Sequence, residues 1–533
     1  MVMILKKIVK MKFIFLNLLC ALTLQSHFSE GAKILGIFLV EAQSHFSYNN
    51  AVMRSLIEVG HAVTIITPFP DQAASENYTS IIDVSPKEKR FVGTSTPDEY
   101  VMQNVMKFMD LMIESDVPYC NKIINLPEIQ KILKSNEKLY DVVFVEISFL
   151  YKCFLPVAEK MKVPIIGTIA IRTWLYADYV MNNPNHPAYI PNELTVHKWK
   201  LSHVFGRIIN VWNHIAVAWY TNFIVPPLIE SFHTNHADKL QSLGKYKHME
   251  PDLIFYNNHE SILPKPSNPN VINVAGIHVK DSKPLPKHIQ KFIDEAKHGV
   301  ILFTFGSVVR ATTMSSEMKN AFRDAFAEIP QRVIWKFEAE LENTPDNVML
   351  IDWLPQRDIL KHENVIAFIS HCGLGATNEA LYTATPVIAC PLFCDQPDNA
   401  ELLENLGVAV HLDFHDITKE SVLKALKQIT NDKRYYNNMQ RVSAVFKDRP
   451  MTPQESVVYW TEYVIRNNGA SHFKTPASRL YLFQYLLLDV VFIVVLFLGI
   501  VLYLINRIFK SFCYYFNPSN TGKTSNKPQS KKL

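Results

Sequence analysis

The sequence predicts an α/β protein made of two large domains and completed by one transmembrane helix. Its 533 residues are too many for a single hydrophobic core and suit two domains. In both halves, apolar β-prone runs alternate with helical patterns, which is typical of parallel sheets covered by helices. Near the C-terminus, residues 486–505 form an apolar segment whose only charge is Asp489. At 1.5 Å per residue, such a segment reaches about 30 Å and can cross a bilayer.

The N-terminal 29 residues have the layout of a secretory signal peptide. Four lysines precede the apolar run from Phe13 to Leu24. A cationic start followed by a short apolar run directs a chain into the secretory pathway. Asn77-Tyr78-Thr79 is the one acceptor sequence for N-glycosylation on the lumenal side, so we expect a glycoprotein.

The first strand–helix–strand unit carries a histidine where a phosphate-binding unit would carry glycines. Its elements are a strand at residues 33–40, a helix at 49–59 and a strand at 62–66. His45 lies in the expected loop between the first strand and the helix, and a histidine in a polar loop is the plainer interpretation. Residues 140–145 predict another buried strand, which ends at Glu146. Without further context, Glu146 is a solvated charge at a strand end.

The segment from 194 to 229 is unusually apolar for a surface. It contains Trp199, Trp212, Trp219 and three basic residues but no acid, and it follows a proline-rich loop at 182–191. Three interpretations stay open, which are contact with a membrane interface, the wall of an apolar pocket, and an ordinary packed helix.

The second half contains a predicted nucleotide site. Residues 299–305 predict a buried strand that ends in Gly306 and Ser307, and the next elements expected are a helix at 318–329 and strands at 333–337 and 348–350. A strand at 365–370, a small-residue turn at 371–375, a helix at 378–383 and a strand at 387–392 follow. Backbone N–H groups at a helix N-terminus after a glycine turn suit a diphosphate. Further helices are expected at 399–406, 420–429 and 453–466.

At these positions the chain resembles the UDP-glycosyltransferase family, in the membrane-bound animal branch that transfers glucuronate or glucose, and within it the invertebrate type. The residues that carry the resemblance are Ser370, His371, Cys372, Gly373, Glu379, Pro386, Pro391, Asp395 and Gln396, with 305–307, 353–356 and 397–399. The resemblance covers residues 33–505. It implies the GT-B fold, in which two Rossmann-like domains face each other.

The resemblance also implies a division of the chain. The expected parts are a signal peptide (1–29), an acceptor-binding domain (30–280), a linker (281–289), a UDP-sugar-binding domain (290–447), a helix that returns to the first domain (448–485), the transmembrane helix (486–505) and a cytosolic basic tail (506–533).

By resemblance, the donor site consists of Gly306, Ser307, Trp353, Gln356, His371, Cys372, Gly373, Gly375, Glu379, Asp395 and Gln396. Trp353 would stack on uracil, and Glu379 would accept hydrogen bonds from the ribose hydroxyls. His371 and the N–H groups of residues 372–376 would face the diphosphate. Asp395 and Gln396 would accept hydrogen bonds from sugar hydroxyls.

The implied chemistry is transfer of a hexose from a UDP-sugar to a hydroxyl of a small lipophilic acceptor, with inversion. His45 is expected to be the general base and Glu146 its partner, where many relatives have Asp. UDP-glucose is favoured and UDP-glucuronate is the alternative, for which Lys336 is a candidate partner of the carboxylate. The UDP-sugar is a co-substrate, and no cofactor is expected. The sequence contains no Asp-x-Asp, so we expect no metal site.

One departure from the family pattern leaves a second function open. Relatives usually have a polar residue at Gly375 and Ser, Thr or Gly at Ala376, where side chains contact phosphate. A membrane-anchored carrier of lipophilic ligands that does not turn over is therefore the alternative to an enzyme.

The charge and the cysteine content limit which partners the protein can bind and in which cell compartment it lies. The formal net charge is +4; four lysines before Phe13 and six cations after Ile505 account for ten positive charges, which leaves residues 30–505 at −6. This balance excludes a nucleic-acid-binding surface of the usual kind. The cations after residue 505 predict a type I protein with its domains in the lumen. Together with this topology, the resemblance implies the membrane of the endoplasmic reticulum. Of seven cysteines, five are lumenal, and their pairing stays open. The family also suggests a role in detoxification and is compatible with a homo-oligomer.

Overall fold

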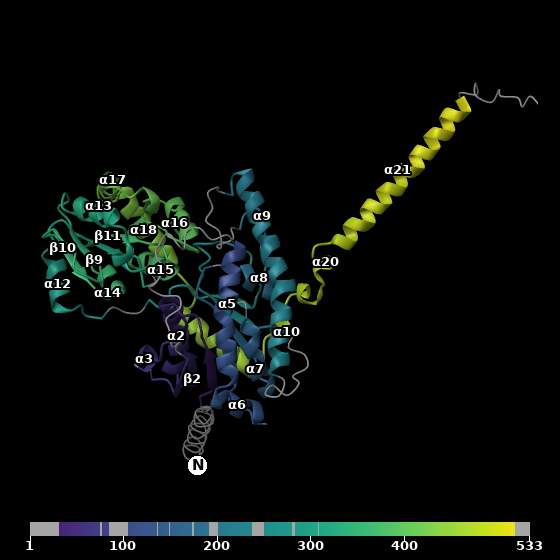
Figure 1. The fold of residues 1–533 in the computed structure, drawn as a ribbon, viewed down its shortest axis with the longest axis horizontal. Helices are drawn as coiled ribbons and strands as arrows, with labels where there is room; N and C mark the ends of the chain where they lie inside the picture. Colours follow the sequence, from purple (N-terminus) through teal and green to yellow (C-terminus); the bar gives the residue numbers. More distant parts are fainter. Residues whose placement is uncertain are drawn as a thin grey trace, which may run out of the picture. The chain divides into compact units, whose positions relative to one another are not determined.

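The computed structural model describes residues 31–74, 77–84, 105–135, 137–148, 150–172, 175–190, 201–236, 250–279, 283–307 and 309–516. The expected signal peptide, part of the expected linker and the tail beyond residue 516 lie outside the described residues. The chain divides into two compact units, Met1–Lys474 and Thr475–Leu533. Figure 1 labels the elements used below.

The first unit contains two parallel sheets, and the N-terminal one has seven strands in the order β3-β2-β1-β4-β5-β6-β7. Its strands are β1 (Lys33–Ile37), β2 (Ala62–Thr67), β3 (Ser80–Asp83), β4 (Val142–Glu146), β5 (Ile165–Ile169), β6 (Leu253–Tyr256) and β7 (Val271–Asn273). The order reverses between β1 and β4, which pair directly through registers such as Ile37 with Val145. This reversal is the switch point of a Rossmann-like sheet.

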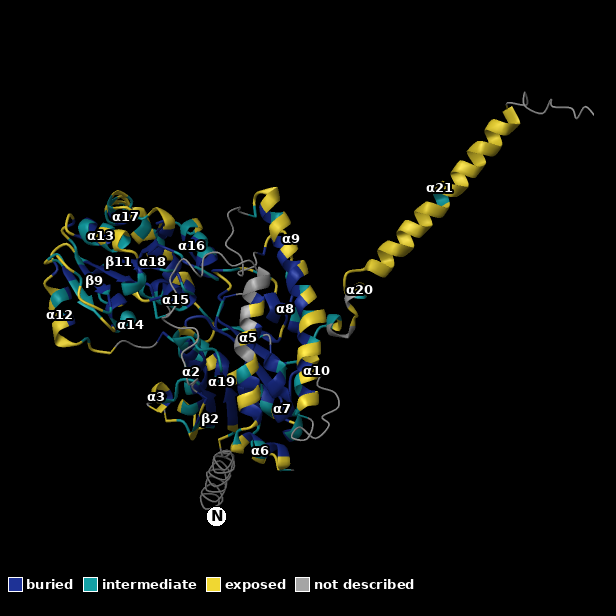
Figure 2. Cartoon of the chain, viewed as in Figure 1, coloured by how far each residue is buried: buried dark blue, intermediate teal, exposed yellow. Residues whose placement is uncertain are grey.

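Helices bury both faces of this sheet, as expected for a parallel sheet. They are α2 (Gln43–Glu58), α3 (Pro70–Ala74), α5 (Val105–Ile124), α6 (Pro127–Lys134), α7 (Leu155–Met161), α8 (Leu175–Val180), α9 (Val204–Trp219) and α10 (Val225–Asn235), with a π-helical turn at Tyr220–Ile224. Along β4, Val143 and Val145 join the core on one face, and Val142 and Phe144 join the core on the other. Figure 2 shows the strands buried between helices whose outer sides are exposed.

The second sheet has six parallel strands in the order β10-β9-β8-β11-β12-β13. Its strands are β8 (Val300–Thr304), β9 (Arg332–Lys336), β10 (Val348–Ile351), β11 (Val365–Ser370), β12 (Val387–Ala389) and β13 (Ala409–His411). The helices of this half are α12 (Lys287–Asp294), α13 (Ser316–Phe326), α14 (Gln356–Leu360), α15 (Leu374–Thr383), α16 (Gln396–Asn405), α17 (Lys419–Asn431) and α18 (Lys433–Lys447). This order is again that of a Rossmann-like sheet, with its switch point between β8 and β11.

Helix α19 (Pro453–Arg466) returns from the second half to the first sheet. It begins with a capping box formed by Thr452 and Glu455 and has proline at its first position, which is a strong start signal. Its residues Val457 and Val464 are buried in the same core as α2, and Gln454 Nε2 donates a hydrogen bond to the carbonyl of Ile277 at 3.0 Å. The chain thereby connects the two sheets a second time.

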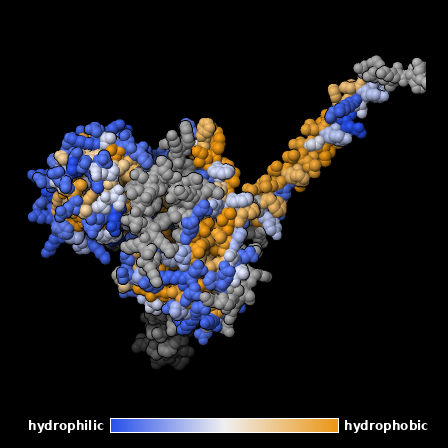
Figure 3. Space-filling view, in the orientation of Figure 1, coloured by the Kyte–Doolittle hydropathy of each residue, from blue (hydrophilic) through white to orange (hydrophobic). Residues whose placement is uncertain are grey.

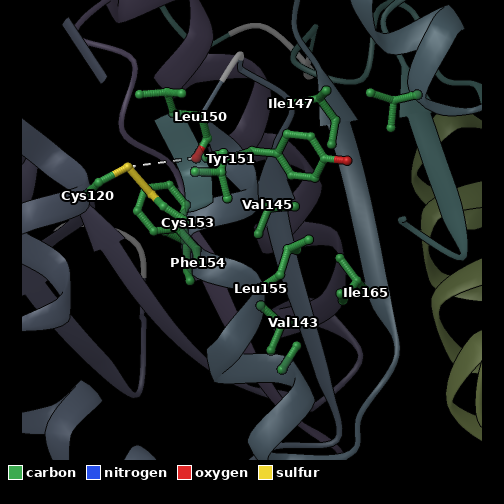
Figure 4. Close-up of a cluster of buried hydrophobic side chains, with 14 of the residues drawn as sticks. Cys120, Val143, Val145, Ile147, Leu150, Tyr151, Cys153, Phe154, Leu155 and Ile165 are labelled. Carbon is green, nitrogen blue, oxygen red and sulfur yellow. Dashed lines mark hydrogen bonds between the residues drawn. A yellow bond between two sulfur atoms is a disulfide. The ribbon is translucent and has the colours of Figure 1, made fainter. Parts of the chain in front are cut away.

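A disulfide resolves part of the open cysteine pairing. Cys120 at the end of α5 is bonded to Cys153 in a 3₁₀ turn, Tyr151–Phe154, that precedes α7. Figure 4 shows the bond beside Leu150 and Phe154, in a cluster of buried apolar side chains. The other described cysteines, Cys372, Cys390, Cys394 and Cys513, are free thiols.

Up to residue 516, where the described part of the second unit ends, it consists of two short helical turns and one long helix. Helix α20 spans Leu482–Tyr485, and α21 spans Leu488–Phe516. Helix α21 is long and apolar enough to cross a membrane, and among the described residues it is the one helix that is. The predicted segment 486–505 lies almost entirely within it, and the helix continues eleven residues further, to Phe516.

Candidate functional site

Four of the residues expected to do chemistry lie at the two switch points, where parallel sheets bind ligands beyond the carboxyl ends of their strands. In the first sheet, Glu146 is the last residue of β4, and His45 follows β1. In the second sheet, Gly306 follows β8, and His371 follows β11.

His45 lies in the first turn of α2, which begins at Gln43, and not in the loop that the sequence predicts. The N–H of Phe46 donates to the carbonyl of Ala42 at 3.0 Å, so the helix starts six residues earlier than expected. Ala42 offers no side-chain cap, which explains why the start was missed.

His45 and Glu146 form a close pair. His45 Nδ1 lies 2.5 Å from Glu146 Oε1, and Asn49 Nδ2 donates to Glu146 Oε2 at 3.0 Å. Asn49 is four residues after His45, so both side chains leave the same face of α2. Glu146 is only 7% exposed, which excludes a solvated charge at a strand end. With Nδ1–H donating to the carboxylate, Nε2 of His45 is left as a proton acceptor.

Burial alone would lower the pKa of His45, but the charge and hydrogen bond of Glu146 outweigh it and leave the pKa above its ordinary value. The charge of Asp395 contributes in the same direction. A residue of the second half is therefore within electrostatic reach of the pair in the first half.

The ring of His371 lies against two glycines. A Cβ atom at Gly306 would stand 2.7 Å from His371 Cε1, and one at Gly373 would stand 2.5 Å from His371 Nε2. Gly306 also has a φ of +76°, which other residues rarely adopt. Burial and the charge of Lys336 lower the pKa of His371 to about 4, so the ring is neutral at physiological pH and can donate one hydrogen bond.

Helix α15 begins four residues earlier than predicted, with Gly373 at its N-cap, and this start determines which groups can meet a ligand. His371, Gly373, Gly375 and Glu379 are partly exposed, whereas Ala376 is 8% exposed and belongs to the apolar core. A hydroxyl at Ala376 would face that core and not a ligand at the start of the helix.

The expectation for Cys372 also needs correction. Its side chain is buried, and its N–H donates to Ser370 Oγ at 3.1 Å. The residue has a φ of 60° and shapes the turn, and its N–H is already used within the protein. The N–H groups that α15 leaves without intrahelical partners begin at its N-cap, Gly373.

Gln356 and Glu379 are brought together by α14 and α15. Gln356 Nε2 donates to Glu379 Oε2 at 2.6 Å. Burial raises the pKa of Glu379 to about 7, against the opposing effects of Gln356 and Arg357. Trp353 is 66% exposed, and Lys336 Nζ lies over one face of its ring, 5.6 Å from the ring centroid.

Asp395 and Gln396 begin α16 and are both buried. Burial raises the pKa of Asp395, although Asn399, Arg172 and His45 each act to lower it. Gln396 Oε1 accepts from the N–H groups of Leu392 and Phe393 at 2.9 and 3.1 Å. Its oxygen is thus used by the backbone, and the side chain can offer a ligand donors and not the acceptor that we expected.

Several residues of the site were assigned no role from the sequence. Asn399 Nδ2 donates both to Asp395 Oδ2 at 2.8 Å and to the carbonyl of Cys372 at 3.0 Å. Arg172 is 4% exposed, its Nε has no hydrogen-bond partner among the described residues, and its charge reaches Asp395. Asn49 could have been found from its spacing of four from His45.

Two contacts join the halves near the α15 turn. Asn378 Nδ2 donates to Asn257 Oδ1 at 2.9 Å, and His278 Nε2 donates to the carbonyl of Gly375 at 3.2 Å. These partners are 121 and 97 residues apart in sequence. In the part of the chain that the structure describes, no group of three or more His, Cys, Asp or Glu residues is arranged to hold a metal ion.

Comparison with known proteins agrees with this geometry. A family model described as UDP-glucoronosyl and UDP-glucosyl transferase matches residues 32–524. UDP-glucosyltransferase 2 of Dactylopius coccus is 38% identical over 480 residues, which cover 87% of this chain and 90% of that protein. UDP-glucuronosyltransferase 2B7 of Homo sapiens is 28% identical over 491 residues, which cover 87% of this chain and 90% of that protein.

Solved structures confirm the expected fold. CalG4, the calicheamicin glycosyltransferase, aligns with a TM-score of 0.54 at 16% identity, over 82% of this chain and 99% of that one. The fold is therefore GT-B, with two Rossmann-like sheets.

The packing of His371 against Gly306 can be tested with a pair of glycine variants. Gly60→Ala changes a residue with a φ of +94° and no atom within 4 Å of the new Cβ, so it should cost about 1 to 2 kcal/mol for backbone strain alone. Gly306→Ala should cost about 1 to 3 kcal/mol more, because the new methyl group overlaps His371. Thermal unfolding of both purified variants measures the difference, and equal losses would show that His371 does not press on Gly306.

Proposed function

The chain belongs to the family of UDP-glucuronosyl and UDP-glucosyl transferases, and from this premise we propose how it works. It is a UDP-glycosyltransferase, an enzyme that uses a UDP-sugar as donor. We propose that it transfers a hexose, glucose in preference to glucuronate, to a hydroxyl of a small lipophilic acceptor. We further propose inversion at the anomeric carbon, with His45 as general base.

The observation that carries the proposal is the 2.5 Å pair between His45 and Glu146, within electrostatic reach of Asp395. Glu146 holds the Nδ1–H tautomer, so Nε2 takes the proton of the acceptor hydroxyl. The acceptor oxygen then forms a bond to the anomeric carbon as the bond to UDP breaks. The electron pair of that bond leaves with the diphosphate, and the charge on Glu146 stabilises the imidazolium that forms.

The donor would lie along the second switch point. Trp353 offers its indole face to uracil, and Glu379 accepts from the ribose hydroxyls. Backbone N–H groups from Gly373 onward and the neutral ring of His371 donate to the diphosphate, where the positive end of the α15 dipole stabilises the departing UDP. Asp395 and the amide group of Gln396 hold the sugar, and the backbone of Gly306 and Ser307 borders the phosphates.

Glucose is favoured because the candidate partner for a glucuronate carboxylate is already occupied. Lys336 Nζ donates to Glu338 Oε1 and to the carbonyl of Gly306, both at 2.9 Å. The carboxylate of Glu338 thus balances its charge. The name of the 38% identical relative, a glucosyltransferase, supports the same choice. The carrier alternative rested in part on Ala376, and it loses that support because Ala376 faces the core.

We propose that α21 anchors the protein in the membrane of the endoplasmic reticulum, with the first unit in the lumen. Arg507 and Lys510 lie toward the end of this helix, and further cations follow it in the sequence, which supports a cytosolic position for that end. The disulfide between Cys120 and Cys153 and the exposed Asn77 of the glycosylation sequence support passage through an oxidising compartment.

The role of His45 is tested by His45→Ala. Loss of the base should reduce transfer from UDP-glucose to a panel of phenols by at least about a hundredfold. The affinity for UDP should stay nearly unchanged, because the donor groups belong to the other sheet. His288→Ala, at an exposed position on α12, is the matched control and should keep the activity of the parent. Release of UDP and formation of product are measured together.

Two outcomes would contradict the proposal. Activity of His45→Ala within tenfold of the parent would remove His45 as the base. No UDP release by the parent with any phenol or UDP-sugar would favour the carrier.

The pKa of Glu379 predicts how donor binding depends on pH. The ionised carboxylate accepts hydrogen bonds from ribose better than the acid does, so affinity for UDP-glucose should be full above pH 7 and fall below it. The loss should approach about tenfold per pH unit once the acid form dominates. Equilibrium binding without acceptor measures this affinity. Glu379→Gln, which cannot ionise, should bind more weakly above pH 7 and show no such fall. Parallel profiles for the two proteins would show that Glu379 does not contact the donor.

A further inference from the structure

Arg172, which follows β5, is a buried cation that forms no ion pair among the described residues. It is 4% exposed, and no other lysine or arginine in the described part of the chain is buried to this extent as a whole residue. Figure 3 shows hydrophilic side chains over most of the visible surface around α13 and α17, which is where charged groups ordinarily lie. A guanidinium stays charged at physiological pH. Burying it is costly unless an anion or another acceptor lies beside it.

The buried amine of Lys265 shows how the protein satisfies a cation elsewhere. Lys265 Nζ lies 2.7 Å from Asp178 Oδ2, and the two side chains are 2% and 1% exposed. Tyr256 and Asn183 also donate to Asp178, so that carboxylate is fully satisfied. Arg172 has no such arrangement among the described residues, where its Nε has no hydrogen-bond partner. A ligand is the obvious source of the missing acceptor.

Arg172 lies close to the seam between the two halves, which we define as the region where Asn257 meets Asn378. Asn257 Nδ2 donates to the carbonyl of Ala170, two residues before Arg172, at 2.8 Å. The oxygen of the same amide accepts from Asn378 Nδ2, on α15, at 2.9 Å. The segment after β5 is thus held against the helix whose N-terminus is proposed to meet the donor.

Asp395 approaches the seam from the second half. Asn399 joins Asp395 to the carbonyl of Cys372, in the turn before α15. The charge of Arg172 acts to lower the pKa of Asp395, so the two groups lie near each other across the seam. They form no ion pair among the described residues. Each therefore keeps hydrogen-bonding capacity that a ligand at the seam can use.

We propose that Arg172 is a sugar-binding residue that the first half contributes to the donor site, and that its guanidinium donates to an oxygen of the transferred hexose. This inference rests on the proposed function, in which Asp395 accepts from hydroxyls of the same hexose. Hydroxyl groups both donate and accept, so a donor and an acceptor on opposite sides can hold one sugar. The charges of Arg172 and Asp395 balance each other, which suits a neutral hexose better than a sugar acid.

Two other ligand groups are candidates for the guanidinium, and the structure favours the sugar over both. His371 is proposed to face the diphosphate, and the cation whose charge acts on its pKa is Lys336. His45 is proposed to face the acceptor hydroxyl, and the charges that act on its pKa are both carboxylates. The charge of Arg172 acts instead on Asp395, the residue proposed to hold the sugar.

Arg172→Met tests the assignment, because it removes the charge and keeps an extended side chain. Arg441→Met, at an exposed position on α18, is the matched control. Equilibrium binding of UDP-glucose, UDP-glucuronate and UDP to the full-length proteins is measured without acceptor. In Arg172→Met the affinity for UDP-glucose should fall about tenfold to a hundredfold, because a charge-assisted hydrogen bond is lost. The affinity for UDP should stay nearly unchanged, because UDP has no hexose.

Thermal unfolding of the free proteins supplies a second readout. If the guanidinium has no partner before the donor binds, its removal relieves an uncompensated buried charge. The unfolding temperature of Arg172→Met should therefore equal or exceed that of the parent. A lower unfolding temperature together with unchanged affinity for UDP-glucose would overturn the proposal and make Arg172 a structural residue.

The three nucleotides distinguish the remaining outcomes. Equal losses for UDP-glucose and UDP would overturn the proposal in favour of a diphosphate contact. A loss confined to UDP-glucuronate would overturn the assignment to a neutral hexose. If Arg172→Met does not fold, Arg172→Lys, which keeps the charge but not the planar fork, should still lower the ratio of UDP-glucose affinity to UDP affinity, and an unchanged ratio would overturn the proposal. A parent that binds UDP-glucose but transfers it to no acceptor would contradict the proposed function alone, because binding is the readout here.

Discussion

The pair of Glu146 with His45 is the constraint on which the proposed chemistry depends. A buried carboxylate is costly unless charged or polar partners satisfy it. The direct pairing of β1 with β4 brings the end of β4 beside the start of α2, so Glu146 meets both His45 and Asn49. His45 and Asn49 satisfy the acid, and in the proposed mechanism Glu146 holds the tautomer of His45 that leaves Nε2 as the base. The proposed catalytic geometry thus follows from sheet topology.

In the second sheet, too, the groups proposed to meet a ligand follow a central strand, but here they are hydrogen-bond donors. A diphosphate requires donors, and the turn after β11 supplies a neutral His371 and the start of α15. The contacts of Asn378 with Asn257 and of His278 with Gly375 join this turn to the first half. They keep the proposed donor turn and the proposed base within a single compact unit.

The sequence predicted well what is local and apolar. The bounds of β11 and α19 agree with the structure to the residue, because a buried run and a capping box mark them. It failed where the signal is weak or distant. Ala42 has no capping side chain, so the sequence does not mark the start of α2. The inward direction of Ala376 depends on where α15 begins. The hydrogen bond between Asn378 and Asn257 joins residues that are 121 positions apart. Arg172 is recognisable only once its burial is known.

The most direct test of the account is the pH dependence of kcat/KM for the acceptor at saturating donor, compared between the parent and Glu146→Gln. Only neutral His45 can accept a proton, so kcat/KM should rise with pH through the pKa of His45, which lies above the ordinary value of 6.5. Removing the charge of Glu146 lowers that pKa, and the rising limb should move to lower pH even though the maximum rate falls. If the rising part of the kcat/KM profile stays at the same pH in Glu146→Gln, the claim that Glu146 raises the pKa of the base His45 is contradicted.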